Sequence, residues 1–351
     1  MSRAFATFAI PCRNAGPYLE PLLRSLLQQT RQDFDVLLVD DASTDDSVAV
    51  ARSVCGDRIR IVQNGTPLGL GGNWNRCAEL VTTPVFCLAH VDDVYASQYL
   101  ERVGAALEAA PTAAFAHCRA HALDESGTVV DSPVERFKDG FWDECRDPDP
   151  RVQFALLRRG NFVMCPSALY RTDLFRAVGP FDPTLRATLD WQRNVRTVLA
   201  GHPLVGVEAP LLGYRRHLQS VTAANLRTLE RYREEAATLR WIEREGLARG
   251  WVAAGAPPSR ALRNNLLYDV FVDLRGRQIE SARTRLAFAR DEAPDLAWDL
   301  AARIVARCAS FGTPGRLALA LALQCVVWRA ELGYFIGSRR RSSTTSRTKR
   351  P

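Results

Sequence analysis

The stretch Phe34-Asp35-Val36-Leu37-Leu38-Val39-Asp40-Asp41-Ala42-Ser43-Thr44-Asp45 decides the fold of this chain. It begins as an apolar run of strand length and ends in carboxylates and hydroxyls, the residue types that open helices. We therefore expect a strand at 34–39 that leads directly into a helix at 43–54. A strand followed at once by a helix is the repeating unit of a sheet covered by helices on both faces.

The same alternation continues on both sides of this stretch. Apolar runs predict further strands at 4–10, 58–62, 85–88 and 113–117. Apolar residues at helical spacing predict helices at 19–27, 69–81 and 100–109. This order predicts an α/β fold with a doubly wound, mainly parallel sheet, whose ligands bind at the carboxyl ends of the strands.

The rest of the chain has a different character. Residues 124–150 are rich in Asp, Gly and Pro and predict a long loop, whereas 162–170 resemble a strand and 191–200 a short helix. From about residue 225, Arg, Ala, Leu and Glu recur with helical periodicity. We expect three parts, which are a sheet domain at 1–222, a helical region at 223–337 and a basic, disordered tail at 338–351.

The positive charge of the chain lies mostly in that tail. The formal net charge is +7, and the six basic residues of the tail account for all but about +1 of it. A nearly neutral folded part excludes a broad basic face for nucleic acid.

The cysteines and the N-terminus indicate a cytoplasmic protein. The nine cysteines are scattered without a C-x-x-C pair, which favours buried, reduced thiols over zinc ligands or disulfides. No run reaches the roughly 18 apolar residues that a membrane span needs. The apolar start at 4–10 is followed at once by Pro11 and Arg13, so a buried strand is favoured over a signal peptide.

Residues 317–328 are apolar around the whole of a predicted helix. So short a stretch cannot span a bilayer. Packing inside the helical region explains it, and so does peripheral contact of 316–351 with the inner face of a membrane through the basic tail.

Asp40 and Asp41 form the first of two acidic pairs at the ends of predicted strands. Their carboxylates offer acceptors to a nucleotide base or ribose. Helix capping explains the residues from Ser43 to Asp45, but it does not explain the adjacent pair.

Asp92 and Asp93 form the second pair, close to His90. Two carboxylates beside an imidazole suit a hard divalent ion such as Mg²⁺ or Mn²⁺ bound to a diphosphate, and a solvated turn is the alternative. The glycine-rich run at 68–75 permits close approach to a phosphate or sugar, but it lacks the G-x-G-x-x-G spacing and also suits a simple loop.

Six strings occur in a characteristic order: Phe8-Ala9-Ile10-Pro11-Cys12-Arg13-Asn14, Val39-Asp40-Asp41-Ala42-Ser43-Thr44-Asp45, Gly72-Asn73-Trp74-Asn75-Arg76, Asp92-Asp93, Gly179-Pro180-Phe181-Asp182 and Leu189-Asp190-Trp191. In this order and spacing the chain resembles glycosyltransferase family 2, which has the GT-A fold. The resemblance covers residues 5–222. It is specific as a combination, although no single string is.

The resemblance implies a site for a nucleotide-diphosphate sugar. Residues that match the family's base-binding positions are Pro11, Arg13, Asn14 and Asp41, and Asn75 belongs to a further string assigned to the donor. The acidic pair would contact the ribose through Asp92 and the metal-bound diphosphate through both carboxylates.

The closing string Tyr214-Arg215-Arg216-His217 also resembles the family. Arg215 or Arg216 would pair with the diphosphate, and His217 would reach the metal or the phosphate. A basic surface turn is the alternative for this string.

The resemblance makes Asp190 the general base that deprotonates the acceptor hydroxyl, with inversion at the anomeric carbon. A capping aspartate at the start of the helix is the alternative. The chain departs from the usual pattern at three places, with His90 for an acidic residue, Leu189 before the base and Gln192 after it.

Two other functions stay open at this point. A nucleotidyltransferase that forms sugar nucleotides would have a glycine-rich loop with Lys or Arg after its first strand, which 11–17 do not supply. A degenerate transferase domain would bind nucleotide sugars as an assembly module without turnover, and His90 and Leu189 favour it.

Overall fold

The computed structural model describes residues 4–217, 219–220, 228–276, 278–297, 303 and 305–306. The chain divides into two compact units, the first at 1–234 with 245–251 and the second at 235–244 with 252–351. The predicted boundary at 222 lies outside the described residues. So do the predicted tail at 338–351 and the apolar stretch at 317–328.

The first unit is built on one mixed sheet. Its strands in the described residues are β1 (Ala6–Cys12), β2 (Phe34–Asp40), β3 (Ile59–Gln63), β4 (Val85–Leu88), β5 (Val94–Tyr95), β6 (Phe115–Leu123), β7 (Val129–Val130), β8 (Leu169–Arg171) and β9 (Leu204–Arg215). The order is β3-β2-β1-β4-β8-β6-β9-β5, with β7 on β6. Strands β3, β2, β1 and β4 are parallel, and so are β6 and β9, whereas β5, β7 and β8 pair antiparallel. The predicted α/β fold with a mainly parallel sheet is confirmed.

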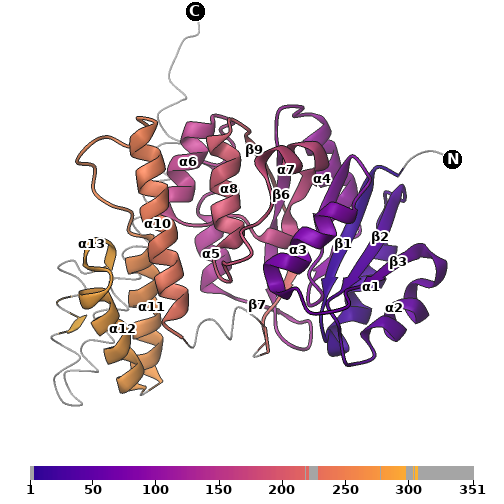
Figure 1. Ribbon diagram of the computed structural model, residues 1–351, viewed down its shortest axis with the longest axis horizontal. Helices are drawn as coiled ribbons and strands as arrows, with labels where there is room; N and C mark the ends of the chain where they lie inside the picture. Colours follow the sequence, from indigo (N-terminus) through magenta and orange to yellow (C-terminus); the bar gives the residue numbers. More distant parts are fainter. Residues whose placement is uncertain are drawn as a thin grey trace, which may run out of the picture. The chain divides into compact units, whose positions relative to one another are not determined.

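Helices cover both faces of this sheet (Figure 1). They are α1 (Leu19–Leu27), α2 (Ser47–Cys55), α3 (Gly69–Leu80), α4 (Tyr99–Glu108), α5 (Pro133–Asp139), α6 (Pro150–Arg159), α7 (Thr172–Val178) and α8 (Leu189–Leu199). Alternate residues of β1, such as Phe8 and Ile10, share a core with the leucines of α1 and with α4. The opposite face packs on α3 and α7, where the rings of Phe86 and Phe175 lie 5.0 Å apart. The side chains of a strand alternate between the two faces of the sheet, and helices cover each face with their apolar sides. The first unit therefore has two hydrophobic cores, one on each side of the sheet.

The parallel register brings the ends of β2 and β4 to the two sides of β1. Cys12 pairs with Asp40 on one side, and Ala9 pairs with Leu88 on the other. Asp41 and the segment from His90 to Asp93 therefore leave the sheet at the same edge, as ligand-binding residues of such sheets do.

Two of the predicted elements are wrong in part. Residues 124–150 are not one long loop, because they contain β7 and α5 and end where α6 begins. Residues 162–170 form a 3-10 turn, η3 (Cys165–Ser167), and only the start of β8. Helix α5 is too short for a periodic signal, and it is held by contacts with distant residues, such as the ion pair of Arg119 with Asp139.

Gly71 allows α3 to approach the loop that precedes α8. A Cβ at this position would lie 2.9 Å from Pro183 Cα and 3.6 Å from Leu189 Cδ1. We expect Gly71→Ala to lower the free energy of unfolding by about 1–3 kcal/mol, the usual cost of overpacking, despite the better helix propensity of alanine. Urea unfolding measures it, and Gly65→Ala is the control, since a Cβ there meets nothing within 4 Å. Equal stability of the two variants would contradict this account.

The second unit is helical in its described part, which agrees with the predicted C-terminal helical region. It contains residues 235–244 of α10 (Glu230–Ala248), together with α11 (Ala261–Arg275), α12 (Ile279–Asp291) and α13 (Pro294–Ala297). Arg285 and Asp273 form a buried ion pair of 2.7 Å between α12 and α11. No helix within the described ranges is both long and apolar enough to cross a membrane.

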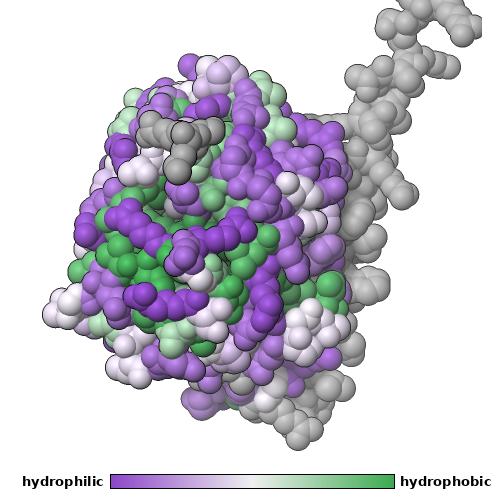
Figure 2. Space-filling model, turned by 90° about the vertical axis from the view of Figure 1, so that its right-hand side faces the viewer, coloured by the Kyte–Doolittle hydropathy of each residue, from purple (hydrophilic) through white to green (hydrophobic). Residues whose placement is uncertain are grey.

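The face of the molecule that contains α2 and β3 is typical of a surface in contact with water. Figure 2 shows hydrophobic areas on it that hydrophilic residues interrupt. Scattered apolar residues of this kind are normal on protein surfaces, so we assign no binding role to this face.

Candidate active site at the sheet edge

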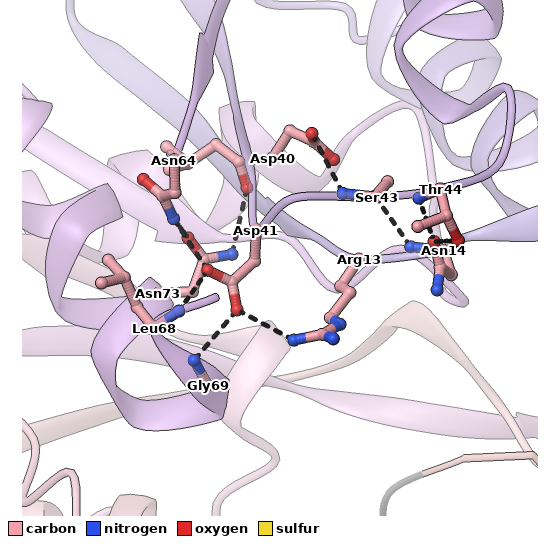
Figure 3. A network of polar contacts seen from close by, with 11 residues as sticks. Arg13, Asn14, Asp40, Asp41, Ser43, Thr44, Asn64, Leu68, Gly69 and Asn73 are labelled. Atoms are coloured by element: carbon pink, nitrogen blue, oxygen red, sulfur yellow. Dashed lines mark hydrogen bonds and ion pairs between the residues drawn. The ribbon is translucent and has the colours of Figure 1, made fainter. Parts of the chain in front are cut away.

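Asp41 lies at the centre of a polar network where β2 leads toward α2 (Figure 3). Its carboxylate accepts hydrogen bonds from Asn64 Nδ2 at 2.9 Å, the amide of Leu68 at 2.7 Å and the amide of Gly69 at 3.0 Å. Nη1 of Arg13 lies 3.8 Å away. The side chain of Asp41 thus compensates the free amides at the start of α3 and ties that helix to the end of β2.

The segment after β1 interlocks with the segment after β2. The amide of Asn14 donates to Ser43 Oγ at 2.9 Å, and the amide of Thr44 donates to Asn14 Oδ1 at 2.8 Å. Asn14 has φ +50°, a conformation that asparagine tolerates better than most residues. Pro11 pairs with Val39 in the sheet. The four residues predicted to hold the base, Pro11, Arg13, Asn14 and Asp41, therefore lie together, with the Arg13 side chain half exposed.

The helix after this segment starts later than predicted. Helix α2 begins at Ser47, and its N-cap is Asp46. Asp45 instead accepts hydrogen bonds from the amide and hydroxyl of Ser47 and from the amide of Gly16. The prediction of a helix start at Ser43 is wrong, because Ser43 and Thr44 bond to Asn14 rather than open the helix.

The segment after β4 brings three possible metal ligands together. Ligand atoms of His90, Asp92 and Asp93 lie within 4.8 Å of one another. Asp93 is fully buried, and its Oδ1 accepts a hydrogen bond from the amide of Arg215 at 3.0 Å. Within the described part of the chain, Asp93 Oδ2 and His90 Nε2 are buried without a hydrogen-bond partner. Such orphaned polar atoms are costly unless a ligand satisfies them.

The ionisation of this group fits a divalent cation. Burial raises the pKa of Asp93 far above its ordinary value, and the nearby Asp92 carboxylate raises it further. Burial also lowers the pKa of His90, so its imidazole is neutral and can donate an electron pair. A cation would offset the repulsion between the two carboxylates. The residues therefore fit Mg²⁺ or Mn²⁺, with Asp92 and Asp93 as the oxygen ligands.

His217 closes this group from the far end of β9. Its Nε2 lies 3.0 Å from Asp92 Oδ2, and its ring centroid lies 4.5 Å from that of Tyr18. His217 Nδ1 is buried without a partner in the described residues. The imidazole therefore contacts one of the possible metal ligands, and its own contact with a cation or a phosphate stays a prediction.

The two arginines before His217 both donate hydrogen bonds within the protein. Arg215 is buried, and its guanidinium donates to the carbonyls of Asp92, Asp124 and Glu125. Arg216 Nη2 donates to Glu135 Oε1 at 2.6 Å. Arg215 therefore holds the loop after β6 onto the segment after β4, and contact of either arginine with a diphosphate stays a prediction.

Asn75 holds the loop that leads toward α8. Its amide donates to the carbonyl of Phe181 and accepts from the amide of Phe181, both at 2.9 Å. The predicted contact of Asn75 with the donor stays untested.

Asp190 lies in the first turn of α8. Oδ1 accepts from the amide of Trp191 at 2.8 Å, and Oδ2 accepts from Asn161 Nδ2 at 2.9 Å. The N-cap is Thr188, which makes no side-chain cap hydrogen bond. Asp190 instead satisfies one of the free amides of the first turn, so the capping role and the catalytic role both stay open. Burial raises the pKa of Asp190, while the Lys138 ammonium opposes the shift. A carboxylate with a raised pKa is suited to accept a proton near neutral pH.

Glu234 fixes the loop that precedes Asp190. Its carboxylate accepts hydrogen bonds from three consecutive amides, those of Arg186, Ala187 and Thr188, at 2.6 to 2.9 Å. Glu234 and the residues of α5 near the site, Glu135 and Lys138, were not predicted. Each lies where the sequence indicates a solvated helix face or a loop, so their roles depend on tertiary contacts.

Comparison with known proteins links the sequence to glycosyltransferases. The family model "Glycosyl transferase family 2" matches residues 7–179. A PGL/p-HBAD biosynthesis glycosyltransferase of Mycobacterium bovis is 29% identical over 201 residues, which are 56% of this chain and 70% of that protein. A second relative, from Mycobacterium tuberculosis, is 34% identical over 92 residues, and the match spans only 29% of its length.

Two solved structures share the fold. TarS of S. aureus, in complex with UDP-GlcNAc, has a TM-score of 0.57 and 15% identity over 93% of this chain and 92% of the other. The mannosyltransferase PcManGT of Pyrobaculum calidifontis, with GDP-Man and Mn²⁺, has a TM-score of 0.56 and 15% identity over 99% and 89%. The fold is that of the GT-A class of nucleotide-sugar transferases. Residues 7–179 of the chain belong to glycosyltransferase family 2.

Proposed function

We propose that this chain transfers a sugar from a nucleotide-diphosphate donor to a hydroxyl of a glycan or a lipid-linked acceptor, with inversion, in cell-surface polysaccharide synthesis. The observation that carries the proposal is the group of His90, Asp92 and Asp93 beside two interlocked strand ends. Within the described residues, one oxygen of Asp93 and one nitrogen of His90 in this group are buried without a hydrogen-bond partner. A cytoplasmic site of action, with peripheral contact at the inner face of a membrane, is part of the proposal.

Each group of residues at the site has its own role in the proposed reaction. Pro11, Arg13, Asn14 and Asp41 surround the place for the nucleotide, with Asp92 next to it for the ribose. Asp92, Asp93 and His217 would hold Mg²⁺ or Mn²⁺, which supplies charge neutralisation for the departing diphosphate. Asp190 accepts the proton of the acceptor hydroxyl. Attack opposite to the departing diphosphate then inverts the anomeric carbon.

A panel of uridine, guanosine and thymidine diphosphate sugars tests the donor part of this proposal. We expect one nucleotide class to raise the melting temperature in Mn²⁺, because a ligand that binds only the folded state stabilises it. For a chain of this size each kcal/mol of stabilisation raises the melting temperature by about 2–4 °C. Equal melting temperatures with every nucleotide sugar, or the same stabilisation in EDTA, would contradict the proposal. Transfer assays with the donor so identified then establish the anomeric configuration of the product.

A further inference from the structure

The Asp190 carboxylate is oriented by a chain of two amides. Asn161 Nδ2 donates to Asp190 Oδ2 at 2.9 Å, and Asn194 Nδ2 donates to Asn161 Oδ1 at 3.2 Å. The oxygen of the Asn161 amide is thus satisfied by Asn194, so its amino group faces Asp190. Asn194 is buried and lies one turn after Asp190 on α8. The same helix therefore carries both the carboxylate and the group that fixes its partner.

Lys138 anchors the segment that bears Asn161. Its Nζ donates to the carbonyls of Asn161 at 2.7 Å and Val163 at 2.9 Å. Lys138 lies at the end of α5, whose next residue, Asp139, is paired with Arg119 on β6. The ammonium of Lys138 therefore connects α5 to Asn161, the residue that contacts Asp190.

Lys138 also places a positive charge near Asp190. Burial lowers the pKa of Lys138 to about 8, and Asp190 is the first of the groups that oppose this shift. The ammonium is therefore charged at neutral pH. The charge of Glu135, on the same helix, is paired with Arg216.

The other titratable groups that face Asp190 are neutral. They are the thiol of Cys165, in η3, and the phenol of Tyr170, on β8. Burial raises the pKa of both groups well above their ordinary values. Among the groups that the structure describes here, Lys138 is thus the one whose charge acts on Asp190 at neutral pH.

We propose that Asn161 and Lys138 are positioning residues for the reaction, in which Asn161 orients the Asp190 carboxylate and Lys138 holds Asn161 and supplies the adjacent positive charge. This inference rests on the proposed role of Asp190 as the general base. It assigns a function to α5, which the proposed function leaves without one.

The pH dependence of kcat tests the charge of Lys138. A general base must be ionised, so kcat rises as the pH rises through the pKa of Asp190. A nearby positive charge lowers the pKa of a carboxyl group. We therefore expect Lys138→Met to move the acid limb of kcat to higher pH, and Lys138→Arg to leave it near the wild-type position. Arg136→Met, which removes an exposed positive charge from the same helix, is the matched control and should not move it.

Asn161→Asp gives a second measurement at an isosteric position. It places a negative charge beside Asp190, so the acid limb again moves to higher pH. Circular dichroism and donor affinity establish that each variant is folded. If Lys138→Met does not fold, the acid limb of kcat in Asn161→Asp tests the inference. An unchanged acid limb in the folded variants, with kcat lowered equally at every pH, overturns this inference. Near wild-type turnover of Asp190→Asn would instead overturn the proposed base, so the two failures are distinguishable.

Discussion

Asp190→Asn is expected to lower kcat by about 10²–10⁴-fold, the usual contribution of general base catalysis, while the affinity for the nucleotide sugar changes little. Asparagine keeps the shape of the side chain but cannot accept the proton of the acceptor hydroxyl. The affected step is therefore transfer, because the residues that we propose to bind the nucleotide lie elsewhere, at the ends of β1, β2 and β4. Transfer rates at saturating donor and acceptor measure the effect.

Asp173→Asn is the matched control for this prediction. Asp173 also lies in the first turn of a helix, α7, and its carboxylate also accepts a hydrogen bond from the next amide, that of Leu174. It is exposed rather than partly buried. Similar kcat values for Asp190→Asn and Asp173→Asn would remove Asp190 from the catalytic mechanism and favour a domain that binds nucleotide sugars without turnover.

Asp93→Asn is expected to abolish the strengthening of donor binding by Mn²⁺. Loss of even an indirect partner of a metal ligand typically lowers metal affinity by about 10–100-fold, and loss of a direct carboxylate ligand should cost at least as much. Asparagine can still accept the hydrogen bond from the Arg215 amide, so the segment after β4 should remain folded. Calorimetric titration of the nucleotide sugar in Mn²⁺ and in EDTA measures this effect.

The control for the ion site is Asp35→Asn, at an exposed carboxylate on β2. This substitution also removes one negative charge, but at a position away from the candidate site. The affinity for the nucleotide sugar should therefore still be higher in Mn²⁺ than in EDTA. If wild-type protein binds the donor equally in both solutions, the group of His90, Asp92 and Asp93 is not a metal site.

The sequence predicts the sheet edge well because its signal is local. Asp41 and Asp93 each follow an apolar strand, and parallel strands that neighbour β1 must end beside each other. The convergence of these segments follows from strand order alone. Residues that come from β1, β2 and β4 are therefore the part of the candidate site that could be placed before the structure.

Contacts between distant segments are the part that could not be predicted. Helix α5 has only seven residues, and its position is set by Lys138 and Asp139 through partners elsewhere in the chain. Arg215 has the side chain of a phosphate ligand, yet its donors bond to the carbonyls of Asp92, Asp124 and Glu125. A sequence pattern shows which groups a side chain offers, whereas the fold decides which of them are already taken.

The contact of His217 with Asp92 joins residues that are 125 positions apart, and the contact of Arg215 with Asp93 spans 122 positions. Chains are synthesised from the N-terminus, and contacts between near neighbours form before those that close long loops. Strands β1 to β4 have therefore emerged from the ribosome long before the last partner of the proposed ion site exists. A chain that ends before residue 215 therefore lacks both of these contacts.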